Sequence, residues 1–135
     1  MKKFILLSML ALVIGITSQA QRAITLPLAA GDTIANTGTA TKVLPVFTAG
    51  YEGVIVQVNL TKLSGTGAGT TALYGSLDGV NYTQIGTSYT ITNTATQAAY
   101  FSVTAPIPVY LKVLSTGSGT ESVKQTILYV PRRHD

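Results

Sequence analysis

The side chains that could transfer a proton are few and widely spaced in this sequence. They are five carboxylates and a single histidine: Asp32, Glu52, Asp78, Glu121, Asp135 and His134. General acid–base catalysis needs two such groups placed together, and a catalytic triad needs a histidine beside its nucleophile. His134 lies at the chain end, where side chains are rarely held in place, and the sequence has no cysteine. We therefore predict that the protein is not an enzyme and has no catalytic residue, metal site or cofactor.

The residues best spaced for binding lie around a turn. Apolar and polar residues alternate from Leu73 to Leu77, an Asp78-Gly79 pair follows, and the alternation resumes at Tyr82. Alternation on both sides of an Asp-Gly pair predicts a β-hairpin. Because strand side chains alternate between faces, Leu73 and Leu77 would share one face.

The turn would offer Asp78, Asn81 and Tyr82 to a ligand or partner, such as a sugar, a protein or Ca²⁺. The alternative is that these polar groups only satisfy the backbone of their own turn, as Asp and Asn commonly do. A single carboxylate falls far short of the roughly six to eight oxygens that Ca²⁺ takes.

Residues 75–86 resemble the "G-S-x-D-G-x-N-aromatic-T-x-hydrophobic-G" signature of small β-sandwich domains in structural proteins of tailed bacteriophages. The likeness continues through the aromatic pair Tyr100-Phe101, a "tyrosine-x-basic-hydrophobic" strand at 110–113, a Gly/Ser/Thr turn at 117–120 and an alternating strand at 123–130. The resemblance implies a virion component, such as a capsid decoration, fibre or tail accessory subunit. Such a subunit would bind copies of itself or other virion proteins and contact the host surface, including its glycans.

The first twenty residues have the pattern of a secretory signal peptide. Lys2 and Lys3 precede an apolar run at residues 4–16, and small residues precede a predicted cleavage between Ala20 and Gln21. The run is shorter than the roughly 20 residues of a membrane-spanning helix, and its ending resembles signal peptides of Bacteroidetes bacteria. We expect an exported protein, either secreted, on the cell surface or in a virion. If the leader is retained, residues 4–16 would provide the only membrane contact.

Charged residues make up only 10% of the chain, against about 25% in an average soluble domain. Uncharged polar side chains are cheaper to remove from water than charged ones, so such surfaces suit packing against copies of the same chain. Adaptation to an extracellular medium is the alternative explanation.

The net charge is +4, partly from Lys2 and Lys3, and no basic stripe with interleaved aromatic residues appears. We therefore expect no nucleic-acid binding.

No helical periodicity follows residue 20, whereas short alternating segments recur between Gly-rich turns. In the clearest of them, Val54, Val56, Val58 and Leu60 share one face. The pattern predicts an all-β fold, a single antiparallel β-sandwich of immunoglobulin-like or jelly-roll-like type with about seven to nine strands.

We divide the chain into a leader (1–20), an N-terminal arm or edge strand (21–41), the sandwich (42–130) and a disordered tail (131–135). Within the arm, Asp32-Thr33-Ile34 resembles the short O-glycosylation pattern of Bacteroidetes, which makes Thr33 a candidate modification site.

Two functions remain open. One is the virion structural protein; the other is a secreted or cell-surface Bacteroidetes module for adhesion or glycan binding.

Overall fold

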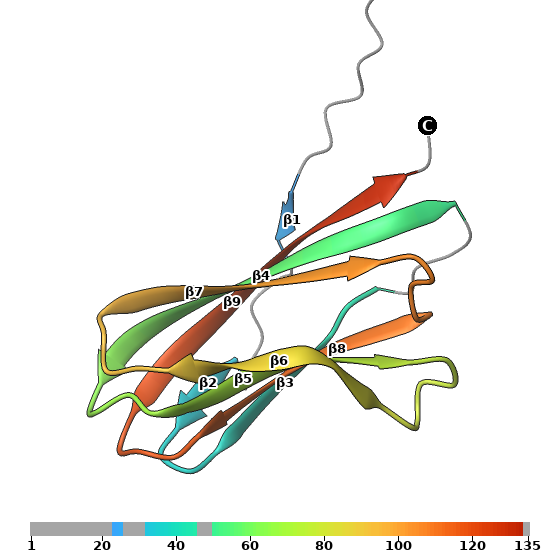
Figure 1. Ribbon diagram of the computed structural model, residues 1–135. Coiled ribbons are helices and arrows are strands. Elements are labelled where there is room, and N and C mark those ends of the chain that lie inside the picture. Colours follow the sequence, from blue (N-terminus) through green and yellow to red (C-terminus); the bar gives the residue numbers. More distant parts are fainter. Residues whose placement is uncertain (1–22, 26–31, 46–49, 134–135) are drawn as a thin grey trace, which may run out of the picture.

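The computed structural model describes residues 23–25, 32–45 and 50–133, and within these ranges the chain forms nine strands and no helix (Figure 1). The strands are β1 (Ile24–Thr25), β2 (Thr33–Ala35), β3 (Thr39–Val43), β4 (Tyr51–Ser64), β5 (Gly69–Ser76), β6 (Thr83–Ile91), β7 (Thr96–Thr104), β8 (Tyr110–Gly117) and β9 (Ser122–Arg133). The all-β prediction is confirmed.

The strands form two antiparallel sheets that pack face to face. One sheet has the order β1-β9-β4-β7, with β2 also paired to β9, and the other has the order β3-β8-β5-β6. β1 and β2 pair with the two halves of β9 and so share one edge of it. Each sheet is therefore four strands wide, and Figure 1 shows the two layers, with β7 and β4 in one and β6 and β5 in the other.

The topology is that of a jelly roll. Without β1, the two sheets have the strand orders β2-β9-β4-β7 and β3-β8-β5-β6. Only β5 and β6 are hydrogen-bonded to each other and also follow one another in the chain. Every other connection crosses between the sheets, as in a jelly roll of two Greek keys. Of the two sandwich types that the sequence leaves open, the structure has the jelly roll.

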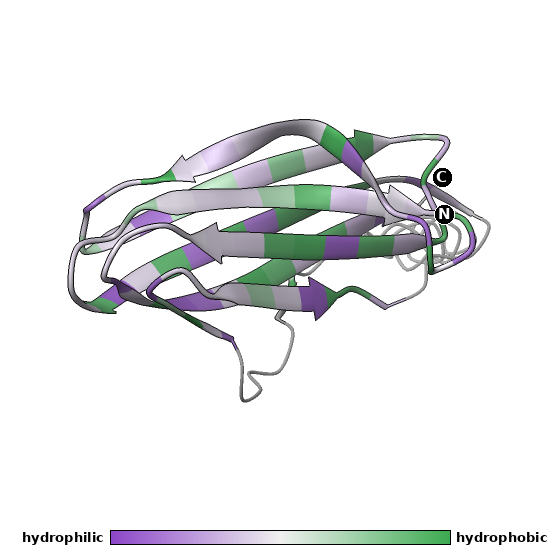
Figure 2. Cartoon of the chain, turned by 90° about the horizontal axis from the view of Figure 1, so that it is seen from below, coloured by the Kyte–Doolittle hydropathy of each residue, from purple (hydrophilic) through white to green (hydrophobic). Residues whose placement is uncertain are grey.

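The core consists of the inward faces of both sheets. Val54, Val56, Val58 and Leu60 of β4 are all buried, as the alternation predicts. They face Leu73 and other apolar residues of the second sheet. Figure 2 shows the same alternation as green bands between white or purple ones along the strands.

One buried polar cluster also joins the sheets. The hydroxyl of Ser115 in β8 lies 2.7 Å from both Thr71 Oγ1 of β5 and Gln125 Oε1 of β9, and all three residues are buried. Because a hydroxyl has one proton, Ser115 donates to the amide oxygen and accepts from Thr71. The bond to Gln125 crosses the sandwich and fixes β8 against β9.

Two predicted boundaries are corrected. The sandwich begins before residue 42, because β2 pairs with β9 and β3 starts at Thr39. The predicted tail at 131–135 is wrong for residues 131–133, which continue β9: Pro131 lies opposite Val54, and Arg132 lies opposite Gly53. Proline is disfavoured inside a strand because it has no N–H group to donate. Here Pro131 nevertheless lies within β9, which continues beside β4 as far as Arg133. Residues 134–135 lie outside the described part.

Candidate functional site

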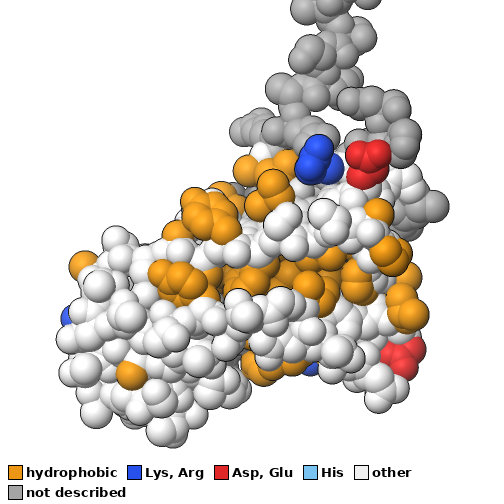
Figure 3. All heavy atoms as spheres, viewed as in Figure 1, with side chains coloured by type: hydrophobic (Ala, Val, Ile, Leu, Met, Phe, Trp, Pro, Cys, Tyr) orange, Lys and Arg blue, Asp and Glu red, His pale blue; other side chains and the backbone are white. Residues whose placement is uncertain are grey.

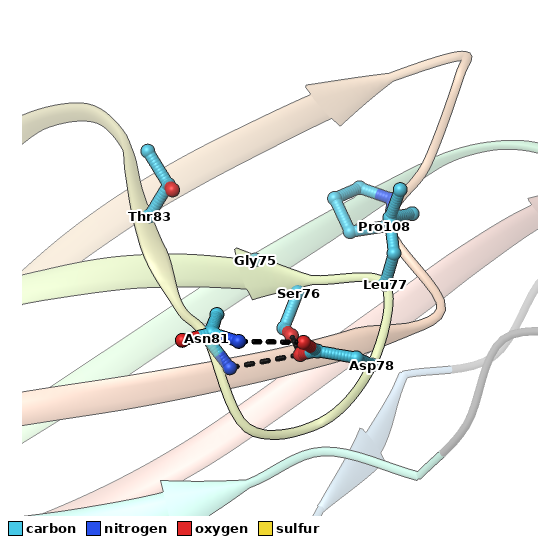
Figure 4. Close-up of a pocket in the computed structure, with 7 residues that line it drawn as sticks. All are labelled: Gly75, Ser76, Leu77, Asp78, Asn81, Thr83 and Pro108. Carbon is cyan, nitrogen blue, oxygen red and sulfur yellow. Dashed lines mark hydrogen bonds between the residues drawn. The ribbon is translucent and has the colours of Figure 1, made fainter.

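The predicted hairpin is formed by β5 and β6, and its connection, residues 77–82, is ordered around one carboxylate. Asp78 Oδ1 accepts hydrogen bonds from Ser76 Oγ (2.7 Å) and from the backbone amides of Val80 and Asn81 (both 2.8 Å). Asp78 Oδ2 accepts from Asn81 Nδ2 at 2.7 Å. Figure 4 shows the Asn81 side chain turned toward this carboxylate. Asp78 is thus bound on both oxygens by its own loop.

These bonds shift the acidity of the group. The hydrogen bond from the Asn81 side chain, followed by those from Ser76 and the two backbone amides, holds the pKa of Asp78 far below its ordinary value. Every one of these donors favours the ionised form. The carboxylate therefore acts as an organiser of the loop, and it offers few free lone pairs to a ligand.

Tyr82, the third predicted contact residue, lies against the sheet. The ammonium nitrogen of Lys112 in β8 is 3.9 Å from the centre of the Tyr82 ring and 5.6 Å from that of Tyr74. A cation at this distance is attracted by the ring face. The loop also lies close to Tyr110: a Cβ added at Gly79, whose φ is +73°, would be 3.4 Å from that ring. Tyr82 thus fastens the loop to β8.

Besides Asp78 and Asn81, the loop exposes two apolar side chains. Leu77 is 79% exposed and Val80 is 78% exposed. The prediction that Leu73 and Leu77 share one face of a strand is wrong, because β5 ends at Ser76: Leu73 is buried in the core, whereas Leu77 is exposed. Sequence reasoning chose the polar residues of the loop and missed these two. The sequence did contain a sign of their exposure: Leu77 and Val80 flank the Asp78-Gly79 pair, and side chains next to a tight turn at the end of a hairpin are not covered by the sheet.

A small pocket lies beside the loop. It measures about 310 Å³ and is lined by Gly75, Ser76, Leu77, Asp78, Asn81, Thr83 and Pro108 (Figure 4). Asp78 is its only titratable group, and the loop already binds that carboxylate. The pocket can hold a small group by contact and hydrogen bonding, but it brings no acid–base pair together. Nowhere in the described ranges do three or more His, Cys, Asp or Glu side chains gather as metal ligands.

A second candidate surface is the outer face of the sheet that contains β4, β7 and β9. Its centre is three rows of three facing residues, which we call the outer patch: Ile55, Ser102 and Val130; Gln57, Tyr100 and Leu128; Asn59, Ala98 and Thr126. None of the nine is charged. Tyr100 is 67% exposed and Ile55 is 41% exposed. The Gln57 and Asn59 amides bond each other at 2.6 Å.

The outer patch ends at a free sheet edge, the outer side of β7. β7 pairs with β4 over all nine of its residues without a register shift, and no described strand pairs with its other side. Its sequence, TQAAYFSVT, contains no charge and no proline. The neighbouring edge strand β6 differs, because an irregularity between Thr71 and Leu73 interrupts its pairing. Figure 3 shows few blue or red side chains on this side of the molecule and apolar ones between the two sheets.

The remaining predicted sites are only partly described. Thr33 is exposed in β2, beside Asp32, whose carboxylate is paired with Lys42 at 3.0 Å. The predicted cleavage between Ala20 and Gln21 and the apolar run at 4–16 lie outside the described residues. In the part of the chain that is described, no helix has the length and apolar character needed to cross a membrane.

No family model and no curated protein matches this chain. Solved structures with a similar fold include a protein of Bacillus endospore appendages, which are described as disulfide-linked pili. It has a TM-score of 0.50 and 16% identity over 86% of this chain and 88% of that one. A carbohydrate-binding module specific for non-crystalline cellulose, CBM28, has a TM-score of 0.48 and 8% identity, over 85% of this chain and 74% of the module. The coat protein of Tobacco streak virus has a TM-score of 0.46 and 7% identity, over 90% of this chain and 92% of the coat protein. At these identities the likeness shows the fold alone: this chain is a small β-sandwich, as the resemblance to phage proteins implies.

Proposed function

We propose that this protein is a non-enzymatic structural subunit that assembles with copies of itself, as an exported component of a bacteriophage virion. The observation that carries the proposal is the free edge of β7, which is regular, uncharged and continuous with the outer patch. Soluble proteins normally protect such an edge with a charge, a proline, a bulge or a covering segment. Among the described residues, none of these protects the outer side of β7, which is therefore suited to pairing with another chain.

The composition of the outer patch supports the same function. Covering Ile55 and Tyr100 removes apolar surface from water, which is favourable by about 25 cal/mol per Å². The amides of Gln57 and Asn59 already bond each other, so covering them leaves fewer polar groups unsatisfied. No charged side chain has to lose its water. The patch can therefore be covered at low cost.

The assembly would be noncovalent. The endospore appendage protein with a similar fold belongs to disulfide-linked pili, but this sequence contains no cysteine. Copies of this chain would have to associate through strand pairing and surface burial. Leu77 and Val80, held outward on the rigid loop, would provide a second contact with a neighbouring virion protein or with the host surface.

The test is the oligomeric state in solution. We expect the purified protein to associate in sedimentation velocity as its concentration rises, and Tyr100→Lys to weaken this association at least tenfold, because the new charge lies in the outer patch. Thr41→Lys is the matched control, since Thr41 is exposed on β3 of the opposite sheet. A wild-type protein that stays monomeric, or equal effects of the two lysines, would reject the proposal.

Glycan binding is the alternative, in a secreted or cell-surface adhesion module. The exposed Tyr100 ring beside the Gln57 amide favours it, because sugars stack on aromatic rings and bond to amides. A glycan array distinguishes the two functions. Binding that is lost in Tyr100→Ala, by a protein that remains monomeric, would support the alternative.

A further inference from the structure

The hydrogen bonds between β4 and β7 determine which backbone groups of β7 face its free edge. The Ala105 amide donates to the Glu52 carbonyl at 2.8 Å, and the Lys62 amide donates to the Ala95 carbonyl at 2.9 Å. Both pairs continue the uninterrupted register of β4 and β7. In an antiparallel pair, facing residues that exchange backbone hydrogen bonds alternate with facing residues that do not. The odd-numbered residues of β7 therefore bond to β4.

The even-numbered residues of β7 direct their N–H and C=O groups to the other side of the strand. They are Thr96, Ala98, Tyr100, Ser102 and Thr104. No described strand pairs with this side. The side chains of these residues lie on the outer face of the sheet, because Ala99, Phe101 and Val103, which alternate with them, are buried in the core. The edge thus presents a regular series of donors and acceptors centred on Tyr100.

This series matches a second copy of itself in one antiparallel register. With a two-fold axis at residue 100, every one of its members faces another member, because residues 96 and 104 face each other and so do residues 98 and 102. A shift of the axis to residue 99 would place Thr104 opposite Thr94, whose amide donates to the Thr92 carbonyl at 2.8 Å. A shift to residue 101 would place Thr96 opposite Pro106, which has no N–H. Only the axis at residue 100 pairs the whole series.

The side chains along the edge are compatible with a second copy. Because a copy brings the same charges, a surface that pairs with itself must keep like charges away from facing positions. No residue of β7 is charged. The axis would bring together the exposed Tyr100 side chains of the two copies, and aromatic pairs across neighbouring strands are stabilising. A charged partner would find no opposite charge along β7.

We propose that two copies of this chain pair through β7 about a two-fold axis at Tyr100. The inference rests on the proposed function, association through the β7 edge, and adds the partner, the strand direction and the register. The sheets that contain β7 in the two copies become one continuous sheet, and the two outer patches become one uncharged face. A two-fold interface closes on itself. This edge therefore produces a dimer, and any larger assembly uses other surfaces.

Engineered cysteines test the register, because the chain has no cysteine of its own. Facing residues of a hydrogen-bonded antiparallel pair have Cα atoms about 5.5 Å apart, a separation that a disulfide can span. Under mild oxidation we expect an equimolar mixture of Ala98→Cys and Ser102→Cys to form the mixed disulfide-linked dimer. Each variant alone is the matched control, because its two cysteines would be about 13 Å apart along the strands. Tyr100→Cys should crosslink to itself.

Amide exchange of the wild type tests the same register without a substitution. As the protein associates, the amides of Ala98, Tyr100 and Ser102 should become protected. The amides of Ala99 and Phe101 should be protected at every concentration, because they already donate to β4. NMR-detected hydrogen exchange at low and high protein concentration measures both sets.

The outcomes separate the register from association itself. A wild-type protein that stays monomeric in sedimentation velocity, with no crosslinked variant, rejects the proposed function and the two-fold pairing together. A protein that associates but crosslinks as readily in Ser102→Cys alone as in the mixture rejects only the two-fold register. Association that leaves the Ala98, Tyr100 and Ser102 amides unprotected rejects it as well, and this measurement holds even if the cysteine variants do not associate.

Discussion

At the scale of the residue, the carboxylates of Asp78 and Glu121 show how differently one chemical group can be used. Asp78 is exposed, yet its oxygens accept four hydrogen bonds from Ser76, Val80 and Asn81. Glu121 is buried and has none. The sequence suggests the first role, because Asp before Gly is a turn signal. It gives no hint that Glu121 is buried, because this residue packs against segments distant in the chain, such as Asn36, whose backbone amide donates to the Glu121 carbonyl at 2.7 Å.

The low pKa of Asp78 makes a prediction about acid. A carboxyl group whose pKa is depressed by folding stabilises the native state above its ordinary pKa, and this contribution is lost as the pH falls through the depressed value. We therefore expect the loop at 77–82 to stay ordered well below pH 3.8. NMR titration of the Asp78 carboxyl carbon and exchange of the Val80 and Asn81 amides would measure this. A normal titration midpoint for Asp78 would contradict this prediction.

At the scale of the element, the alternation along β4 is the best predictor in the sequence. Its four buried residues from Val54 to Leu60 occupy the face that the sequence assigns to the core. The prediction fails where strands end. The alternation alone does not show that β5 ends before Leu77, although the Asp-Gly pair that follows is a turn signal. The extension of β9 through Pro131 depends on pairing with β4, which the local pattern does not show.

The polar bridge between β8 and β9 predicts a loss of stability. Ser115→Ala should lower the free energy of unfolding by about 1–3 kcal/mol, because Thr71 and the Gln125 amide oxygen would lose a buried hydrogen-bond partner. Ser102→Ala, at an exposed position of β7, should change it by less than about 0.5 kcal/mol. Urea denaturation followed by circular dichroism measures both. Equal losses in the two variants would show that the bridge contributes nothing specific.

At the scale of the whole molecule, the amino-acid composition predicts the character of the surface better than the hairpin motif predicts the contact residues. The chain has few charged residues, and in the structure the outer patch has none and the edge strand β7 has neither a charge nor a proline. The jelly-roll order could not be read from the sequence, because the same short strands fit several sandwich topologies and the choice depends on long-range pairing. The contact of Lys112 with Tyr82 is equally nonlocal.

Hydrogen–deuterium exchange measured at low and high protein concentration would show whether the free edge of β7 pairs with another copy of the chain, because it reports on the backbone of β7 itself. We expect residues 96–104 to become protected as the protein associates, while the β3 edge, residues 39–43, exchanges at an unchanged rate. Exchange of β7 that is independent of concentration, in a protein that remains monomeric, would contradict the claim that this edge exists to be paired.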